Sequence, residues 1–189
     1  LPLSGLMPYA AAPGLYMRLP PLPAISPDPK PPPRFTITPR ARTAGMNPIA
    51  PISNEAAALQ MRFYPDLTGR RLDASVDRVL AALAPVIAAR GWKVRGPLPT
   101  TSPAPEISIE MEAPTILLRF PADAVVRLID EEVSTFVDMR MASRYASHDL
   151  GNNARRIESF LAGLAAELER QSLEIIDIPP SDGNEDAVD

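Results

Sequence analysis

The chain has 189 residues, of which 46% are hydrophobic and 24 are proline, and its formal net charge at pH 7 is −4. This length predicts one domain with appended segments, and a net-acidic chain with only a short basic stretch does not favour a nucleic-acid partner. The absence of cysteine excludes disulfides, thiol catalysis and cysteine-ligated zinc, and no apolar run reaches the roughly 18 residues that a membrane-spanning helix needs.

Residues 1–51 predict an extended, proline-rich arm. Most of the prolines lie here, and proline fixes its own φ and disfavours helix at the residue before it. The arm also carries apolar and aromatic side chains that need cover, so we expect either its own domain or a partner to hold it. The residues predicted to bind a partner are Leu6, Met7, Tyr9, Leu15, Tyr16, Met17 and Phe35.

Residues 52–178 carry the pattern of a folded domain, and residues 179–189 form an acidic tail. Apolar residues alternate with others over 59–63, which predicts a strand. Helical spacing then predicts a helix over 74–90, with Asp73 as its N-cap and with a kink or break at Pro85.

Strand patterns follow this helix. They lie at 92–95, 106–112, 115–120, 124–129 and 133–142. In the second of these, Glu106, Glu110 and Glu112 share one face. A solvated acidic face is favoured there over a calcium site, because calcium ligands usually come from a curved loop. We expect no metal site and no cofactor.

The last helix is predicted from about Asn152 to Gln171, and residues 173–178 are expected to add a short strand or an extended tail. A block of strands between two helices predicts an α+β fold. We expect an antiparallel sheet of about four to six strands, covered by two helices, with the extended proline-rich arm at the N-terminus.

Polar residues gather between the last strand and the last helix. The N-terminus of a helix offers free N–H groups to an anion, so this turn predicts a site for a carboxylate, a phosphate or a lipid headgroup. Its residues are Arg140, Arg144, Asn152, Asn153 and Arg156. The alternative is internal: the arginines pair with Asp138, Asp149 and Glu158, and an asparagine caps the helix.

Catalytic motifs are absent from the sequence. His148 is the one histidine, and its neighbour Asp149 is poorly placed to orient it because adjacent side chains usually point apart. Asp149 is instead a candidate cap for the last helix, and Gly151 permits the turn before it. A hydrolase that uses His148 and Asp149 is the least favoured function.

The residues of this turn match a family pattern. A strand beginning at Val137 passes through Ser143–Arg144 and then through Asp149, Leu150, Gly151, Asn153 and Arg156 into a helix. The run closely resembles the signature of the bacterial domain-of-unknown-function family numbered 1499, which has an Asp-Leu-Gly-x-Asn-x-x-Arg-like turn at this point. The resemblance extends upstream to 124–127, 90–94 and 60–67, and more weakly to 31–35.

The resemblance implies no established activity and no catalytic set. It implies membrane association, on the periplasmic side rather than the cytoplasmic side, because relatives often carry a transmembrane segment or a lipoprotein signal ahead of the domain. The favoured function is therefore a non-catalytic accessory or assembly subunit that docks on a membrane protein complex or a membrane-anchored protein, partly through the arm. The alternative is a module that binds a small molecule or lipid headgroup at residues 140–156.

Overall fold

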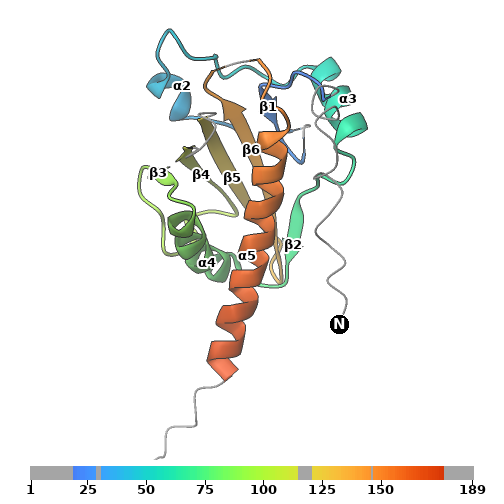
Figure 1. Cartoon of the computed structure of the whole chain (residues 1–189). Coiled ribbons are helices and arrows are strands. Elements are labelled where there is room, and N and C mark those ends of the chain that lie inside the picture. The colour runs from blue at the N-terminus through green and yellow to red at the C-terminus, as the bar shows by residue number, and fades with distance from the viewer. Residues whose placement is uncertain (1–18, 29–30, 115–120, 146, 177–189) are drawn as a thin grey trace, which may run out of the picture.

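The computed structural model of the chain describes residues 19–28, 31–114, 121–145 and 147–176. Figure 1 shows the arrangement of the six strands and four helices in these ranges. The strands are β1 (Ala24–Ile25), β2 (Arg70–Leu72), β3 (Lys93–Arg95), β4 (Glu106–Ala113), β5 (Ala122–Asp130) and β6 (Thr135–Ser143). The helices are α2 (Thr38–Ala41), α3 (Asn54–Phe63), α4 (Val76–Ala89) and α5 (Asn152–Ile176). The strand expected at 115–120 lies outside the described residues.

Consecutive strands β3, β4, β5 and β6 pair as an antiparallel meander. The remaining two strands both pair with the outer edge of β6: β1 lies beside Met141 and Ala142, whereas β2 lies beside residues 135–137. One six-stranded antiparallel sheet results, so the predicted α+β class is confirmed. Because β1 comes from the predicted arm, the described part of that arm is built into the sheet.

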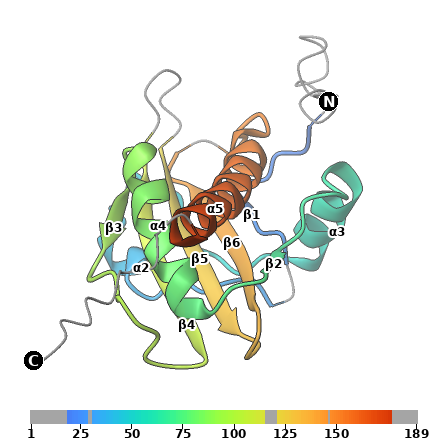
Figure 2. The same ribbon diagram turned by 90° about the horizontal axis from the view of Figure 1, so that it is seen from below.

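One face of the sheet packs against α4 and α5, which lie together on the same side of it (Figure 2). Alternate residues of β6 are fully buried here, namely Val137, Met139 and Met141. The apolar stripe of α5 meets them with Ile157, Leu161, Leu164 and Leu168. The rings of Trp92 and Phe160 stack with centroids 5.3 Å apart, which closes the core next to β3.

The start and the middle of α4 differ from the prediction. Its N-cap is Ser75, whose hydroxyl accepts from the backbone N–H of Arg78, so the assignment of Asp73 is wrong. The helix does not end near Pro85 but continues to Ala89. Pro85 lies on the exposed side, where water can solvate the carbonyl that lacks a partner because proline has no N–H.

Two short predicted extended segments are helical instead. Residues 59–63 belong to α3, which buries Ala57 and Gln60 and leaves Met61 56% exposed. A three-residue alternation cannot separate a strand from one side of a helix, and here the helix is fixed by its N-cap Ser53. Likewise, α5 continues to Ile176, so residues 173–176 are neither strand nor extended tail.

The cap assignment can be tested by comparing Ser75→Ala with Asp73→Ala. Loss of the Ser75 hydroxyl should lower the free energy of unfolding by about 1 kcal/mol, because an orphan N–H of the first turn loses its acceptor. The Asp73→Ala variant should change it by less than about 0.5 kcal/mol. Urea unfolding of both variants measures the difference, and the reverse order of effects would restore Asp73 as the cap.

Candidate functional site

The face of the sheet opposite α4 and α5 carries ionisable side chains. They alternate with the core residues along β4, β5 and β6 and include Glu110, Glu112, Asp123, Arg127, Asp138 and Arg140. Most are buried, because residues 24–28 and 31–51, here called the strap, lie over them. The expectation that Glu110 is solvated is therefore wrong: it is only 3% exposed.

Glu110 anchors the strap to β4. Its carboxylate accepts the backbone N–H groups of Thr36, Ile37 and Thr38 at 2.5, 2.8 and 2.7 Å, just where α2 begins. Burial by itself raises the pKa of Glu110, but these hydrogen bonds outweigh it and the pKa is lowered. The carboxylate thus stays ionised and satisfies the free donors of the helix start.

A fully buried carboxylate, that of Asp123, gathers three arginines. Arg42 of the strap approaches it at 2.9 Å, Arg95 of β3 at 3.2 Å and Arg144 at 2.7 Å. Burial raises the pKa of Asp123, but the hydrogen bond and charge of Arg144 and the charge of Arg42 outweigh it, so this pKa is also lowered. Arg144 is thereby committed to an internal partner.

The pairing of Asp138 with Arg127 leaves Arg140 without a carboxylate partner. Asp138 lies directly opposite Arg127 in the β5–β6 register and binds it through two hydrogen bonds of 2.7 and 3.0 Å. Asp138 therefore does not pair with Arg140, and the expected internal pairing is wrong for that residue. Arg140 lies opposite Val125.

Arg140 is 5% exposed, and no carboxylate among the described residues lies within ion-pair distance of it. Its Nη2 donates to the backbone oxygen of Ala50 at 2.5 Å, and its guanidinium stacks on Phe35, 5.5 Å from the ring centroid. Its buried Nε has no acceptor. Burial lowers the pKa of Arg140 because it disfavours the charged form, and the nearby positive charge of Arg42 lowers it further.

A pocket of about 300 Å³ opens beside Arg140. The strap, the start of α3 and the end of β6 form it, with apolar walls from Ala24, Ile49, Ile52, Ala56 and Ala142. Three serines and Asn47 also line it, and among the described residues of the lining Arg140 is the one that carries a charge. Burial, charge and open space therefore coincide at this point of the described structure.

The other predicted anion-binding residues do not join this pocket. Asn153 donates to the Ser143 hydroxyl, and Asn152 begins α5. Arg156 donates to the carbonyls of Ala113 and Pro114 and stacks over Trp92. Burial lowers the pKa of Arg156 to about 10, partly offset by Asp149. The five predicted residues therefore lie at four different places: the pocket, the Asp123 carboxylate, the start of α5 and the end of β4.

His148 and Asp149 are both used in packing the turn. The Nδ1 atom of His148 accepts from the backbone N–H of Leu150, so Nε2 carries the proton that it donates to the Leu19 carbonyl at 2.8 Å. The carboxylate of Asp149 accepts the N–H groups of Gly151 and Asn153 at the start of α5. Both side chains therefore have partners within the protein.

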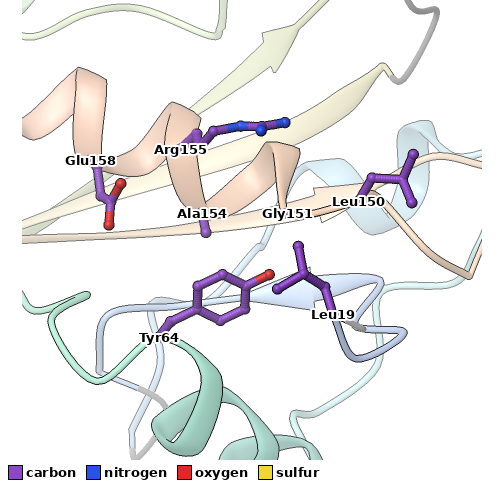
Figure 3. Close-up of a pocket in the computed structure, with 7 residues that line it drawn as sticks. All are labelled: Leu19, Tyr64, Leu150, Gly151, Ala154, Arg155 and Glu158. Atoms are coloured by element: carbon purple, nitrogen blue, oxygen red, sulfur yellow. The ribbon is translucent and has the colours of Figure 1, made fainter. Parts of the chain in front are cut away.

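Gly151 closes a tightly packed corner that Figure 3 shows. It has a φ of +73°, and a Cβ there would lie 2.9 Å from a methyl group of Leu19 and 3.1 Å from the Tyr64 hydroxyl. The gap between Leu19, Tyr64 and the first turn of α5 measures about 20 Å³, which is room for about one water. This corner is a packing contact and not a ligand site.

Of the predicted partner-binding residues, the structure describes only Phe35. It is buried against Val125, Ala142 and the Arg140 guanidinium, so it is not presented to a partner. Leu6, Met7, Tyr9, Leu15, Tyr16 and Met17 lie outside the described residues. Residues 47–53, which form one wall of the pocket, were not predicted from the sequence. The feature that could have indicated them is an uncharged run rich in proline and isoleucine where the arm joins the domain.

Within the described ranges, no group of three or more His, Cys, Asp or Glu side chains is arranged to hold a metal ion. Among the same residues, no helix combines the length and the apolar character needed to cross a membrane.

These features define the class as an α+β protein whose antiparallel sheet has a helical layer on one face and an N-terminal strap on the other. A family model described as Protein of unknown function (DUF1499) matches residues 24–164. The chain therefore belongs to this family, as the turn at 149–156 predicted. The match begins at β1 and so includes the strap.

Comparison with curated proteins gives no match. The crystal structure of TTHA0849 from Thermus thermophilus is similar over 56% of this chain and 97% of its own, with 14% identity and a TM-score of 0.31. Neither the family description nor this title names a ligand, a partner or a reaction.

The buried carboxylates predict how stability depends on pH. The pKa values of Glu110 and Asp123 are lower in the folded protein than in the unfolded chain, so the unfolded chain takes up protons first as the pH falls. Their stabilisation should be complete above about pH 5 and lost progressively below about pH 4. Urea unfolding of wild type and Glu110→Gln across this range measures it.

In Glu110→Gln the free energy of unfolding should be lower at neutral pH by about 1–3 kcal/mol and should change less on acidification, because the strap donors lose their charged acceptor. Glu169→Gln, on the exposed side of α5, is the matched control and should follow wild type. An unchanged pH dependence in Glu110→Gln would contradict the anchoring role.

Proposed function

We propose that the protein is a non-catalytic binding module that holds a small organic anion in the pocket beside Arg140. The buried guanidinium carries this proposal. A buried ion without a counterion costs several kcal/mol, and Asp123 and Asp138 on the same face both have partners of opposite charge. An anionic ligand would supply the charge that Arg140 lacks.

The chemistry of the pocket lining favours binding over catalysis. Its hydroxyl groups belong to Ser53, Ser143 and Ser147, and the part of the lining that the structure describes contains no histidine and no carboxylate. A serine acts as a nucleophile only beside a base that takes its proton. The Ser53 and Ser143 oxygens also already accept hydrogen bonds, from Ala56 and Asn153 respectively.

This proposal keeps one part of the anion site expected from the sequence and relocates it. Arg140 remains because it lines the pocket, whereas Arg144 binds Asp123 and Arg156 lies away from the pocket, against the carbonyls at the end of β4. The ligand would therefore lie between the sheet and the strap and not at the N-terminus of α5.

The proposal is tested by thermal unfolding with the sodium salts of acetate, benzoate, octanoate and phosphate. At about ten times its dissociation constant, a ligand should raise the midpoint by roughly 3–5 °C in wild type and in the control Arg40→Gln, which changes an exposed arginine of α2. Arg140→Gln should not respond. It should also be no less stable than wild type without ligand, because it removes a buried, uncompensated charge.

Equal shifts in wild type and Arg140→Gln would contradict the proposal, and so would the absence of any shift in wild type.

We further propose that the protein is a membrane-associated accessory subunit on the periplasmic side, docked on a membrane protein complex partly through residues 1–18. The apolar and aromatic composition of that segment supports this. On the described surface, Leu59 and Met61 of α3 are 37% and 56% exposed, a second apolar feature available to a partner.

A variant lacking residues 1–18 tests this second proposal. It retains Leu19 and the strap, so the fold is kept, whereas removal of residues 1–51 would also strip the cover from the sheet. The full chain should sediment with native membranes and coprecipitate one membrane protein, and the shortened chain should do neither. Equal recovery of both chains in the membrane fraction would contradict docking through residues 1–18.

A further inference from the structure

The pocket beside Arg140 offers a single cation within a largely uncharged wall, and this composition restricts the ligand. Arg127 and Arg42, the nearby arginines of the same face, are already bound to Asp138 and Asp123. A ligand with two negative charges would therefore bring one more charge into the site than the site can neutralise. The charge balance selects a monoanion.

The geometry of Arg140 selects a planar acceptor. Phe35 stacks on the guanidinium and Ala50 fixes its Nη2, so the orientation of the planar group is set before a ligand arrives. The Nε of Arg140, on one edge of this plane, is buried and has no acceptor among the described residues, so a carboxylate would reach that edge only through a small shift of the pocket wall. The edge of a guanidinium matches the two oxygens of a carboxylate, which can accept side by side.

The size and the wall of the pocket define the rest of the ligand. A volume of about 300 Å³ has room for at least about ten water-sized groups, and so for a ligand of about ten non-hydrogen atoms. Ile49, Ile52 and Ala56 offer apolar contact to a body of this size. A carboxyl group accounts for three of these atoms, leaving room for about seven carbons.

We infer that the pocket binds a monocarboxylate with a medium-length aliphatic chain, its carboxylate on Arg140 and its chain against the strap and α3. This inference rests on the proposed binding function and specifies its ligand class. Octanoate, with ten non-hydrogen atoms, is the matched probe. Because Ala50 both bonds Arg140 and lines the pocket, the ligand would also hold the strap on the sheet.

Isothermal titration calorimetry of the full chain tests the inference with four probes besides octanoate. Octanoate should bind at least about tenfold more tightly than octanol, which lacks the charge, and about 100-fold more tightly than acetate, which lacks the chain. Butyl phosphate, a dianion of similar size, should bind more weakly than octanoate. Dodecanoate should gain less over octanoate than the burial of four further methylene groups would give, because part of its chain would extend into solvent.

Ala56→Leu is a second variant that leaves Arg140 untouched. Ala56 lines the pocket from α3, so the larger side chain should weaken the binding of octanoate by at least about tenfold and the binding of acetate by less. Ala58→Leu, on the exposed side of the same helix, is the control and should bind octanoate like wild type.

The outcomes separate the inference from the function on which it rests. If small anions bind through Arg140 but octanoate binds no better than octanol, acetate or butyl phosphate, the inference is overturned and the binding function stands. If no anion binds, both the inferred ligand class and the proposed binding function are contradicted. Flotation with phosphatidylcholine vesicles that contain oleic acid distinguishes a membrane source of the carboxylate from a free one. Tighter binding to these vesicles than to octanoate would contradict the inferred chain length.

Discussion

The structure depends on burying the charged face of its sheet without leaving the charges uncompensated. The strap achieves this with specific groups: three backbone N–H groups for Glu110, the Arg42 guanidinium for Asp123 and a backbone oxygen, that of Pro31, for Arg127. Such a face is stable only if each ion finds a partner, because desolvation costs several kcal/mol per ion. The strap is therefore as much a part of the fold as the helices on the opposite face.

Arg140 is the exception on this face, and its isolation follows from strand register. In the β5–β6 pairing, Arg127 lies opposite Asp138, and Arg140 lies opposite the apolar Val125. The strap meets Arg140 with a ring and a carbonyl, and neither carries a full charge. Where the strap rises toward α3, the same arginine borders an open volume. The proposed binding function would account for this cost, because an anionic ligand would supply the missing charge.

The strand–turn–helix at 137–157 has a different role from the one its polar composition first indicates. Asp149 caps α5, Gly151 permits a close approach of Leu19 and Tyr64, and His148 bonds the Leu19 carbonyl. These contacts join the beginning of the described chain to its last helix. The turn is therefore a structural corner within the family match, and the candidate ligand site lies on the other face of the sheet.

Long periodic patterns in the sequence by themselves determined the strands of the meander and the two covering helices, and the residues of the turn at 149–156 indicated the family. Those patterns report local geometry and the burial of one face, which extend over many residues. They failed at 59–63 and at residues 173–176, where too few residues distinguish the two periods. Only the tertiary structure decided which charges pair, because Asp123 lies far along the chain from Arg42 and the strand register chooses its partners. It likewise decided that Arg140 borders the pocket of about 300 Å³ between the sheet and the strap.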